Sequence, residues 1–392
     1  MDEFNTGRGE ISILSSISLI SGGICSYFVA KLLENRSSRK FMLWGSIIGS
    51  IGFFLSASVN SLWQLYVLFF IVGIGLNGIA GSVPIAILIS KWFAKKRGLA
   101  LGIAWSGFPL GSMVVMPIIG LIVEQSGWRA SFLFAGAVTL VTSIPLLLWV
   151  VKDTPEEMGL LPDGNRVKEV KNTPTSKTAI ETDNSTADKP RLITYLKSAP
   201  LWLISIGFCL LVMSEMAVIQ HEVSFVTDMG ISAVLAASAF GFTAGMSGFG
   251  RWGTGWLADK ISPRYVIILL TGIEIIGIII LLQTRTMAMV WIFAVIWGVA
   301  SGSFFSILPL IVRDIFPASA FNTVFGFVNG LFFLAMGLGT PLAGFIFDAT
   351  GSYHWVFILV IIFYTLAIIS TYLAYGIKPG RLRSIPKGDS DN

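Results

Sequence analysis

Eleven long apolar stretches dominate this sequence and constrain its fold more than any other feature. Each is about 20 residues long, the length that an α-helix needs to cross a bilayer. Unpaired backbone amides are too costly inside lipid, and barrel strands alternate over only about 10 residues, so continuous stretches predict helices. The sequence therefore predicts an all-α polytopic membrane protein, with spans at residues 11–33, 41–59, 62–90, 99–123, 130–151, 201–225, 234–257, 265–282, 287–312, 320–347 and 355–375.

The few charged residues follow a topological pattern. Only 12% of the residues are charged, whereas soluble domains carry about 25%. Most of the 27 lysines and arginines fall in alternate loops, in the 152–200 segment and in the tail. By the positive-inside rule these regions are cytoplasmic, which predicts a multi-pass protein of the plasma or inner membrane with a cytoplasmic C-terminus. The net charge of +5 thus reflects topology, and no nucleic-acid partner is expected.

The sequence contains few residues that could form an enzyme active site or a metal site. Its two cysteines, Cys25 and Cys209, both fall within apolar stretches, and its two histidines are scattered. No disulfide framework, metal cluster or cofactor is therefore expected. No nucleophile–base set or phosphate loop is apparent, so we expect no enzymatic activity. Residues 1–10 are acidic and polar, unlike a cleavable signal peptide.

A polar segment divides the chain into two related halves. Residues 152–200 lack apolar periodicity and predict a cytoplasmic linker. It separates a five-helix N-terminal bundle (1–151) from a six-helix C-terminal bundle (201–377), which a cytoplasmic tail (378–392) follows. The halves match at an offset of 225 residues and then, after one loop, of 224. Glycines and prolines dominate the matches, as repeated close contacts and kinks require: Gly52 with Gly277, Gly73 with Gly298, Pro84 with Pro309, Pro117 with Pro341 and Gly120 with Gly344.

The same offset places the counterpart of span 201–225 upstream of Met1. We therefore expect a twelve-helix ancestor whose first helix is absent from this sequence. The alternatives are a fragment or misassigned start, and a genuine eleven-helix protein.

Charged loop motifs carry a resemblance to a known family. The pattern G-x-L-a-D-r-x-x-x-R appears as GWLADKISPR at 255–264, and a weaker copy, AKLLENRSSR, at 30–39. With these motifs the chain resembles the major facilitator superfamily. Four further segments are similar to its monocarboxylate-transporter and oxalate/formate-antiporter branch: KWFAKKRGLALGIAWSG (91–107), SGWRASFLF (126–134), DTPEEMGLLPDG (153–164) and HEVSFVTDMGIS (221–232). The resemblance implies two six-helix bundles around a central cavity, with alternating access.

Arg251 is the arginine within a span. It lies eight residues before Asp259, about 12 Å inside the membrane boundary at 1.5 Å per residue. An arginine at such a depth costs roughly 2.5–3.5 kcal/mol on insertion scales, so it needs a partner or a cavity. In the branch that the chain resembles, an arginine on this helix binds substrate carboxylate, which suits a guanidinium fork. The alternative is that Arg251 snorkels to the headgroups.

Other residues are expected around the same cavity. The resemblance places five side chains on cavity-lining helices, although each also fits ordinary packing between helices: Asn77, Trp105, Phe108, Asn329 and Phe332. The repeat relates Phe108 to Phe332, so these two rings are expected to face each other. Where the oxalate/formate relatives carry a lysine, this sequence reads Ala335-Met336-Gly337. A site with one cation favours a monocarboxylate over a dianion.

Glu215 and His221 are the candidates for proton coupling. A carboxyl within a span can carry a proton through the transport cycle, and His221 resembles a histidine of the branch. The alternatives are a structural carboxyl, neutral or paired with Arg251, and an interfacial histidine without a transport role. Glu274 also lies within a span, and we interpret it as structural or lipid-facing.

The loop motifs predict a gate. By resemblance, an acid at a helix end pairs with the opposite bundle in one state. The gate residues are Glu34, Arg39, Asp259, Lys260 and Arg264.

Together these features predict a monomeric secondary transporter of small organic anions. We expect monocarboxylates as substrates and protons as the coupling ion. The alternatives are an exporter of drugs or amphiphiles, and a non-transporting sensor or inactive remnant.

Overall fold

The computed structural model describes residues 4, 6–33, 36–93, 97–164, 192–258, 260–317 and 320–377. The regular elements in this part of the chain are helices. The first half contains α1 (Arg8–Leu32), α2 (Ser38–Ser56), α3 (Leu62–Val72), a π-helix (Gly73–Ile79), α4 (Ser82–Trp92), α5 (Arg97–Pro145) and a second π-helical turn (Leu146–Val150). The second half contains α6 (Leu192–Leu196), α7 (Ala199–Asp228), α8 (Ala233–Ala258), α9 (Pro263–Leu282), α10 (Met287–Ala300), α11 (Ser303–Ile315), α12 (Phe321–Thr350) and α13 (Tyr353–Gly376).

All eleven predicted spans are helical, but three of their boundaries differ from the prediction. α5 contains two spans, which are joined at Gly127, where a positive φ of 79° breaks the helical path. The span at 62–90 is divided by the π-helix into α3 and α4. The span at 287–312 is divided at Gly302, also with φ 79°, into α10 and α11. Apolar periodicity gives the length of a span, whereas these glycine breaks depend on local backbone geometry.

Short polar turns set the ends of several helices. The Ser37 side chain accepts a hydrogen bond from the amide of Lys40 and caps α2, and Ser352 caps α13 through the amide of His354. Proline stands in the first turn of α7 and of α9, where its missing N–H costs no helical hydrogen bond.

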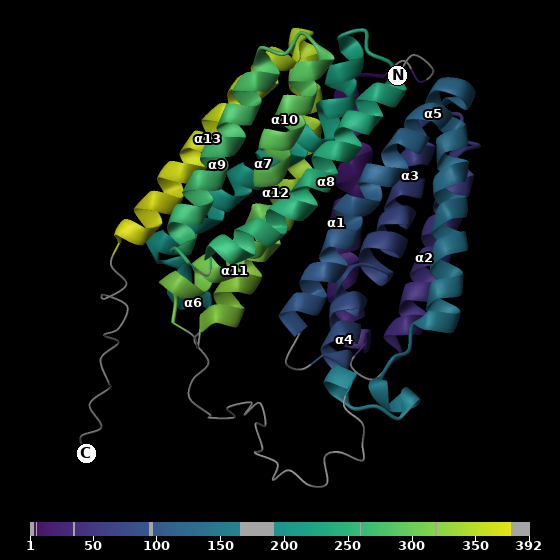
Figure 1. Cartoon of the computed structure of the whole chain (residues 1–392), viewed down its shortest axis with the longest axis vertical. Helices are drawn as coiled ribbons and strands as arrows, with labels where there is room; N and C mark the ends of the chain where they lie inside the picture. Colours follow the sequence, from purple (N-terminus) through teal and green to yellow (C-terminus); the bar gives the residue numbers. More distant parts are fainter. Residues whose placement is uncertain are drawn as a thin grey trace.

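The helices form two bundles side by side (Figure 1). α1 to α5 make the N-terminal bundle, and α7 to α13 make the C-terminal bundle. α1 packs against α12 and α5 packs against α8, so these four helices form the interface between the bundles. Residues 165–191 and 378–392, in the predicted linker and tail, lie outside the described residues.

The closeness of the interface changes along α12. We call the end that carries residues 152–164 the linker end, and the end that carries Arg8 and Asp228 the far end. In the far half, a Cβ on Gly344 of α12 would lie 2.6 Å from the Cα of Gly9. In the linker half of the same helix, Gly326 and Gly330 have nothing within 4 Å of that position. The contact of α12 with α1 is therefore tight at the far end, and the glycines of α12 nearer the linker end have no close neighbour, while α8 and α5 stay in contact as far as Arg251 and Trp105.

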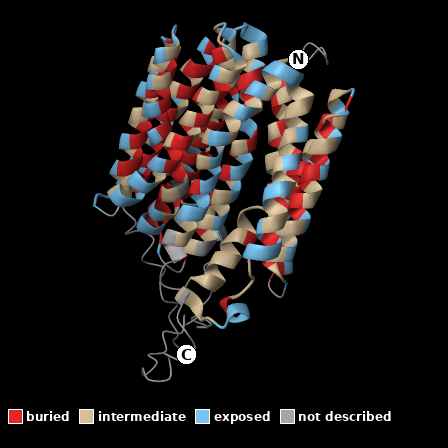
Figure 2. Cartoon of the chain, turned by 45° about the vertical axis from the view of Figure 1, so that its right-hand side comes forward, coloured by how far each residue is buried: buried red, intermediate tan, exposed pale blue. Residues whose placement is uncertain are grey.

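The C-terminal bundle holds most of the buried apolar side chains, as Figure 2 shows. Its core includes Trp297, Phe293 and Tyr364, each at most 1% exposed. The buried cluster of the N-terminal bundle is smaller and centres on Leu14, Val59 and Leu65. Since helices in lipid associate mainly through close packing, the C-terminal bundle is the more rigid frame for the residues described next.

Candidate functional site

Arg251 lies on α8, on the face that meets the N-terminal bundle. Its Nη1 donates a hydrogen bond of 3.1 Å to the backbone oxygen of Trp105 in α5. Its Nε lies 3.1 Å from the position that a Cβ on Gly302 would occupy. The guanidinium thus lies between the two bundles, next to the break between α10 and α11. The roles that the sequence predicts for Arg251, a substrate anchor or a side chain that snorkels to the headgroups, stay predictions.

The helix break beside Arg251 has a counterpart in the other bundle. Gly302 has a left-handed backbone with φ 79°, and the repeat offset places it opposite Asn77, in the π-helix Gly73–Ile79. A broken helix leaves backbone carbonyls and amides without their usual helical partners. Membrane transporters place such breaks where they line a cavity. The two breaks therefore lie at equivalent positions of the two halves, and one of them lies beside Arg251.

The structure places the five predicted lining residues in different surroundings. Trp105 contributes its backbone oxygen to Arg251, and Phe108, on the same helix, is 79% exposed. Asn77 points toward α1, where its amide nitrogen donates to the hydroxyl of Ser18 at 3.1 Å. Asn329 is half-buried on α12. None of the hydrogen bonds described here joins Asn77 or Asn329 to Arg251.

The fifth lining residue, Phe332, departs from the prediction. Phe332 is 1% exposed in the core of the C-terminal bundle, and its ring lies 5.5 Å from that of Phe304. Phe108 is exposed, so the two repeat-related rings do not face each other across the interface. The predicted pairing is wrong because equivalent helices of the two bundles bury different faces.

Glu215 lies in a buried acidic cluster of the C-terminal bundle. Its side chain, on α7, is 0% exposed, and the Tyr364 hydroxyl of α13 lies 3.5 Å from Oε1. The carboxyl groups of Glu215 and Glu274 are in side-chain hydrogen-bonding contact, and Arg251 acts on Glu215 through its charge. Glu274, on α9, is 1% exposed. The lipid-facing alternative for Glu274 is therefore wrong, because its side chain points into the bundle toward α7, whereas the structural alternative stays open.

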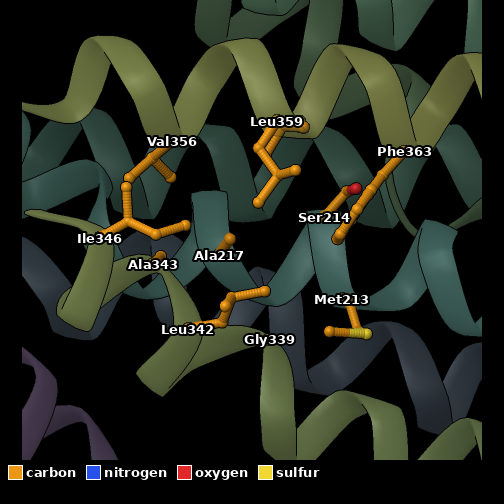
Figure 3. Close-up of a pocket in the computed structure, with 11 residues that line it drawn as sticks. Met213, Ser214, Ala217, Gly339, Leu342, Ala343, Ile346, Val356, Leu359 and Phe363 are labelled. Atoms are coloured by element: carbon orange, nitrogen blue, oxygen red, sulfur yellow. The ribbon is translucent and has the colours of Figure 1, made fainter.

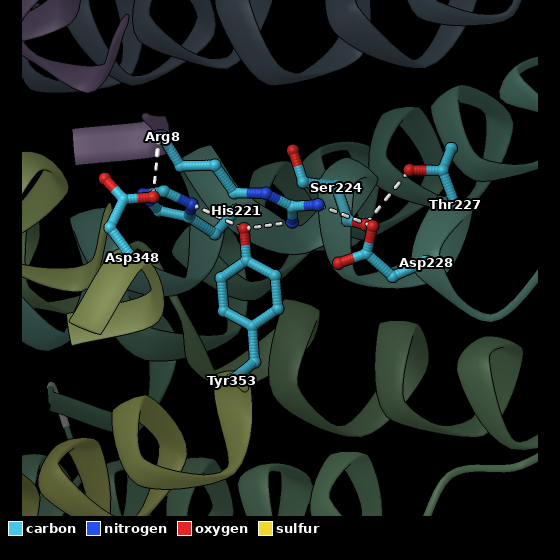
Figure 4. A network of polar contacts seen from close by, with 7 residues as sticks. All are labelled: Arg8, His221, Ser224, Thr227, Asp228, Asp348 and Tyr353. Carbon is cyan, nitrogen blue, oxygen red and sulfur yellow. Dashed lines mark hydrogen bonds and ion pairs between the residues drawn. The ribbon is translucent and has the colours of Figure 1, made fainter. Parts of the chain in front are cut away.

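His221 belongs to a polar cluster at the far end (Figure 4). Its Nδ1 lies 2.9 Å from the Tyr353 hydroxyl, and its Nε2 lies 3.0 Å from the Thr340 backbone oxygen and 3.2 Å from the Ser12 hydroxyl. Ser12 belongs to the N-terminal bundle and the other two to the C-terminal bundle. His221 thus connects the bundles at the far end. Arg251, on α8, lies closer to the linker end.

Arg8 completes this far-end cluster, which we define as Arg8, Ser12, His221, Asp228, Asp348 and Tyr353. The Arg8 guanidinium donates to Asp228 at 2.6 Å and to the Tyr353 hydroxyl at 2.7 Å. Both carboxylate oxygens of Asp348 accept from the first amides of α1, those of Arg8 and Gly9, at 2.8 and 2.7 Å. An acid at this position satisfies the free amides of a helix N-terminus and interacts favourably with its dipole. A residue of one bundle therefore caps a helix of the other.

The predicted gate residues make contacts within their own bundles. Arg39 donates to the backbone oxygens of Leu147 and Leu148. Lys260 lies 3.9 Å from the centre of the Trp256 ring, and Arg264 lies 4.5 Å from that of Tyr372. Glu34 and Asp259 lie outside the described residues. The gate assignment stays a prediction.

The far-end cluster is the part of the molecule that sequence reasoning missed. Its charged members stand at the start of one apolar stretch and the ends of two others, where charges are ordinary. A usable signal existed, because Arg8, Asp228 and Asp348 all lie at the same membrane boundary. Only the three-dimensional arrangement shows that three helix ends converge on one arginine.

Two small cavities among the described residues can be compared with the candidate site. One, of about 110 Å³, lies at the far-end cluster and is lined by Arg8, Ile11, Ser12, Ser15, Gln220, His221, Ser224 and Thr340. The other lies between α7, α12 and α13 (Figure 3) and has a volume of about 10 Å³ with mainly apolar walls. A volume of that size holds at most one water molecule. It is a packing gap rather than a substrate site.

Comparisons with known proteins agree with this architecture. Rat (Rattus norvegicus) monocarboxylate transporter 2 is 28% identical, over 91% of this chain and 73% of its own length. Mouse (Mus musculus) monocarboxylate transporter 12 is 24% identical, over 86% of this chain and 71% of its own length. These relatives are transporters and not enzymes, as the sequence predicted.

Solved structures show the same fold. The crystal structure of a bacterial homologue of the human lysosomal transporter Spinster, inward-facing and unoccupied, superposes with a TM-score of 0.69 at 18% identity, covering 95% of this chain and 90% of that one. The profile of the Major Facilitator Superfamily matches residues 1–308 and 254–390. With two helical bundles and a family match across nearly its whole length, the chain belongs to the major facilitator superfamily.

Proposed function

We propose that this protein is a secondary active transporter of small organic anions, carrying monocarboxylates together with protons by alternating access. The observation that carries the proposal is the position of Arg251 between the bundles, beside the broken helix at Gly302. A guanidinium binds a carboxylate through two parallel hydrogen bonds. The relatives named monocarboxylate transporters support this class of substrate.

The surroundings of Arg251 favour a substrate with one carboxylate and an apolar body. Trp105 is 38% exposed, and Phe108 is 79% exposed on the same helix. Apolar and aromatic walls with few polar groups are typical of sites for small organic ligands. Ala335-Met336-Gly337 stand where the resemblance to oxalate/formate antiporters would place a lysine, which favours a monocarboxylate over a dianion.

The conformation corresponds to one state of the transport cycle. The positive-inside rule assigns the linker end to the cytoplasm. α12 packs tightly against α1 at the far end, whereas Gly326 and Gly330 nearer the linker end have nothing within 4 Å of a Cβ position, which supports an inward-open state. The described gate residues, Arg39, Lys260 and Arg264, make their printed contacts within their own bundles, and we expect the gate residues to pair with the opposite bundle in the outward-open state. We propose that the protein acts as a monomer in the plasma or inner membrane.

Proton coupling is assigned to Glu215. This carboxyl is fully buried, and Arg251 acts on it through its charge. Protonation of Glu215 removes a negative charge that competes with the substrate carboxylate for the guanidinium. Proton binding and anion binding are then linked, each favouring the other.

Uptake measurements in proteoliposomes test the proposal. With an inward proton gradient, the wild-type protein should accumulate one or more labelled monocarboxylates. Arg251→Ala should abolish that uptake, and Arg251→Lys should weaken it because an ammonium lacks the bidentate fork. Arg285→Gln, a change of an exposed arginine in the loop between α9 and α10, is the matched control.

Two outcomes would contradict the proposal. Unchanged uptake in Arg251→Ala would remove its central residue. Efflux of apolar cationic dyes by both the wild type and Arg251→Ala, without carboxylate uptake, would instead show the exporter that the sequence left open.

A further inference from the structure

Two glutamates from different helices meet in the core of the C-terminal bundle. Glu215 of α7 is 0% exposed and Glu274 of α9 is 1% exposed. Their carboxyl groups are in side-chain hydrogen-bonding contact. Glu274 lies away from the interface between the bundles, so it influences the Arg251 site through its contact with Glu215.

The described residues give this pair few hydrogen-bond donors. The Tyr364 hydroxyl lies 3.5 Å from Oε1 of Glu215. Oε2 of Glu215 and both oxygens of Glu274 receive no hydrogen bond from a donor in the described part of the chain. Ionised carboxylates are acceptors only, and two buried like charges in contact repel each other. A hydrogen bond between these two groups therefore requires a proton on one of them.

We propose that Glu215 and Glu274 form a single proton-binding site, which shares one proton at rest and takes up a second during the transport cycle. The proposal rests on the proposed function and adds its second protonatable residue. The ligand is a proton from the aqueous phase, bound as the O–H of a carboxylic acid and returned to water on the opposite side.

Groups from three further helices surround the pair. Arg251 of α8 acts on Glu215 through its charge. The Tyr364 hydroxyl of α13 lies 3.5 Å from Oε1 of Glu215, and Trp297 of α10 lies close to Tyr364. With one proton, the pair carries a single negative charge that attracts Arg251. With two protons it is neutral and no longer competes with an organic carboxylate for the guanidinium, so the second proton and the anion bind together.

Glu274 therefore acts as a positioning residue. It acts on the substrate site through Glu215, because the shared proton exists only while both carboxyl groups are present. A merely structural glutamate on α9 would change stability, but it would not change how uptake depends on the proton gradient.

The test compares three glutamine variants of the full chain in liposomes: Glu274→Gln, Glu215→Gln and the double variant. Glutamine keeps the size of the side chain and supplies its own donor. Each variant should lose accumulation of a monocarboxylate driven by a proton gradient, yet retain exchange of labelled for unlabelled anion at equal pH. Glu222→Gln is the matched control, since Glu222 is a glutamate on α7 that is 1% exposed and held by Thr243 at 2.7 Å.

The possible results separate the two proposals. Gradient-driven accumulation that persists in Glu274→Gln but not in Glu215→Gln would place the proton on Glu215 alone and overturn the pair. Loss of coupling in Glu222→Gln as well would overturn the assignment to this site. A wild-type protein that transports no organic anion would contradict the proposed function, and the proton site would then be judged by spectroscopy.

Infrared spectroscopy of the purified protein provides that second measurement. The wild type should show the C=O band of a protonated carboxyl group from the pair. Glu274→Gln and Glu215→Gln should each remove the same band, and the double variant should remove nothing more. Two independent, additive losses would show two separate acids and overturn the shared site, as would a band that survives in the double variant but is lost in Glu222→Gln. The double variant, a neutral pair of amides, keeps the comparison valid if a single variant does not fold.

Discussion

Arg8 and Asp228 form an ion pair of 2.6 Å that joins the first turn of α1 to the last turn of α7. These residues belong to different bundles, and Arg8 also donates to Tyr353 of α13. The two charged side chains are only 15% and 38% exposed, so solvent screens them less than a pair on an open surface. The pair therefore stabilises the state in which the far end is closed.

Removing this ion pair should open the far end. Asp228→Asn deletes one charge and should cost about 1–2 kcal/mol of closure, which shifts the ratio of the two states by roughly 5–30-fold. The measurement is the labelling rate of a single cysteine introduced at Ser15, a residue that lines the far-end cavity. We expect faster labelling in Asp228→Asn and a return toward the wild-type rate in the charge-exchanged variant Arg8→Asp with Asp228→Arg.

Asp314→Asn is the control for this experiment. Asp314 lies in α11 and accepts from the Tyr375 hydroxyl at 3.0 Å within the C-terminal bundle. Its loss should leave the labelling rate at position 15 unchanged. Equal acceleration in both variants would show that general loosening, rather than the ion pair, controls the far end.

The close approach of α1 and α12 gives a second, steric prediction. A Cβ on Gly344 would lie 2.6 Å from the Cα of Gly9, and backbone atoms cannot move aside independently of their helix. Gly344→Ala should therefore force the bundles apart at the far end, lower the transport rate and speed labelling at position 15. Gly330→Ala, on the same helix with nothing within 4 Å, should change neither. If the two variants behave alike, close packing at Gly344 does not hold the far end closed.

The architecture was predictable from the sequence, because its causes act within single helices. Apolar length, loop charges and the repeated glycines and prolines each report on one span at a time. The errors in the span boundaries also have local causes. The sequence shows that residues 127 and 302 are glycines, but it does not show that their φ angles are positive.

The candidate site was predictable only where one residue type was decisive. Arg251 stands out because an arginine within an apolar span needs a special explanation. For Glu274 the sequence left a structural and a lipid-facing alternative open, because a span alone does not tell which face points inward, and the burial of its side chain excludes the lipid-facing one. Phe332 was misplaced because repeat symmetry relates backbones and not the faces that are buried. The far-end cluster depends on three helix ends converging, which no single segment encodes.

The contact between Gly302 and Arg251 gives a third prediction. An alanine at Gly302 would adopt a left-handed backbone, which costs of order 1–3 kcal/mol, and its Cβ would crowd Nε of Arg251. We expect Gly302→Ala to raise the KM for the transported anion, in addition to any loss of thermal stability that the backbone strain alone causes. Gly351→Ala is the matched control, because Gly351 has φ 69° and nothing within 4 Å. It carries the same backbone strain without an arginine nearby, so an equal rise in KM would show that strain alone is responsible.

Exchange of His221 distinguishes a connecting role from a proton-carrying role. Both ring nitrogens are engaged, Nδ1 with Tyr353 and Nε2 with Thr340 and Ser12, so the imidazole links the two bundles through fixed hydrogen bonds. A glutamine can donate to the Thr340 oxygen but cannot take up a proton near neutral pH. We expect His221→Gln to retain uptake driven by a proton gradient, whereas His221→Ala should lose the link and speed labelling at position 15. If His221→Gln instead loses the gradient-driven component and keeps anion exchange, the histidine itself carries the coupled proton and the role assigned to Glu215 must be shared with it.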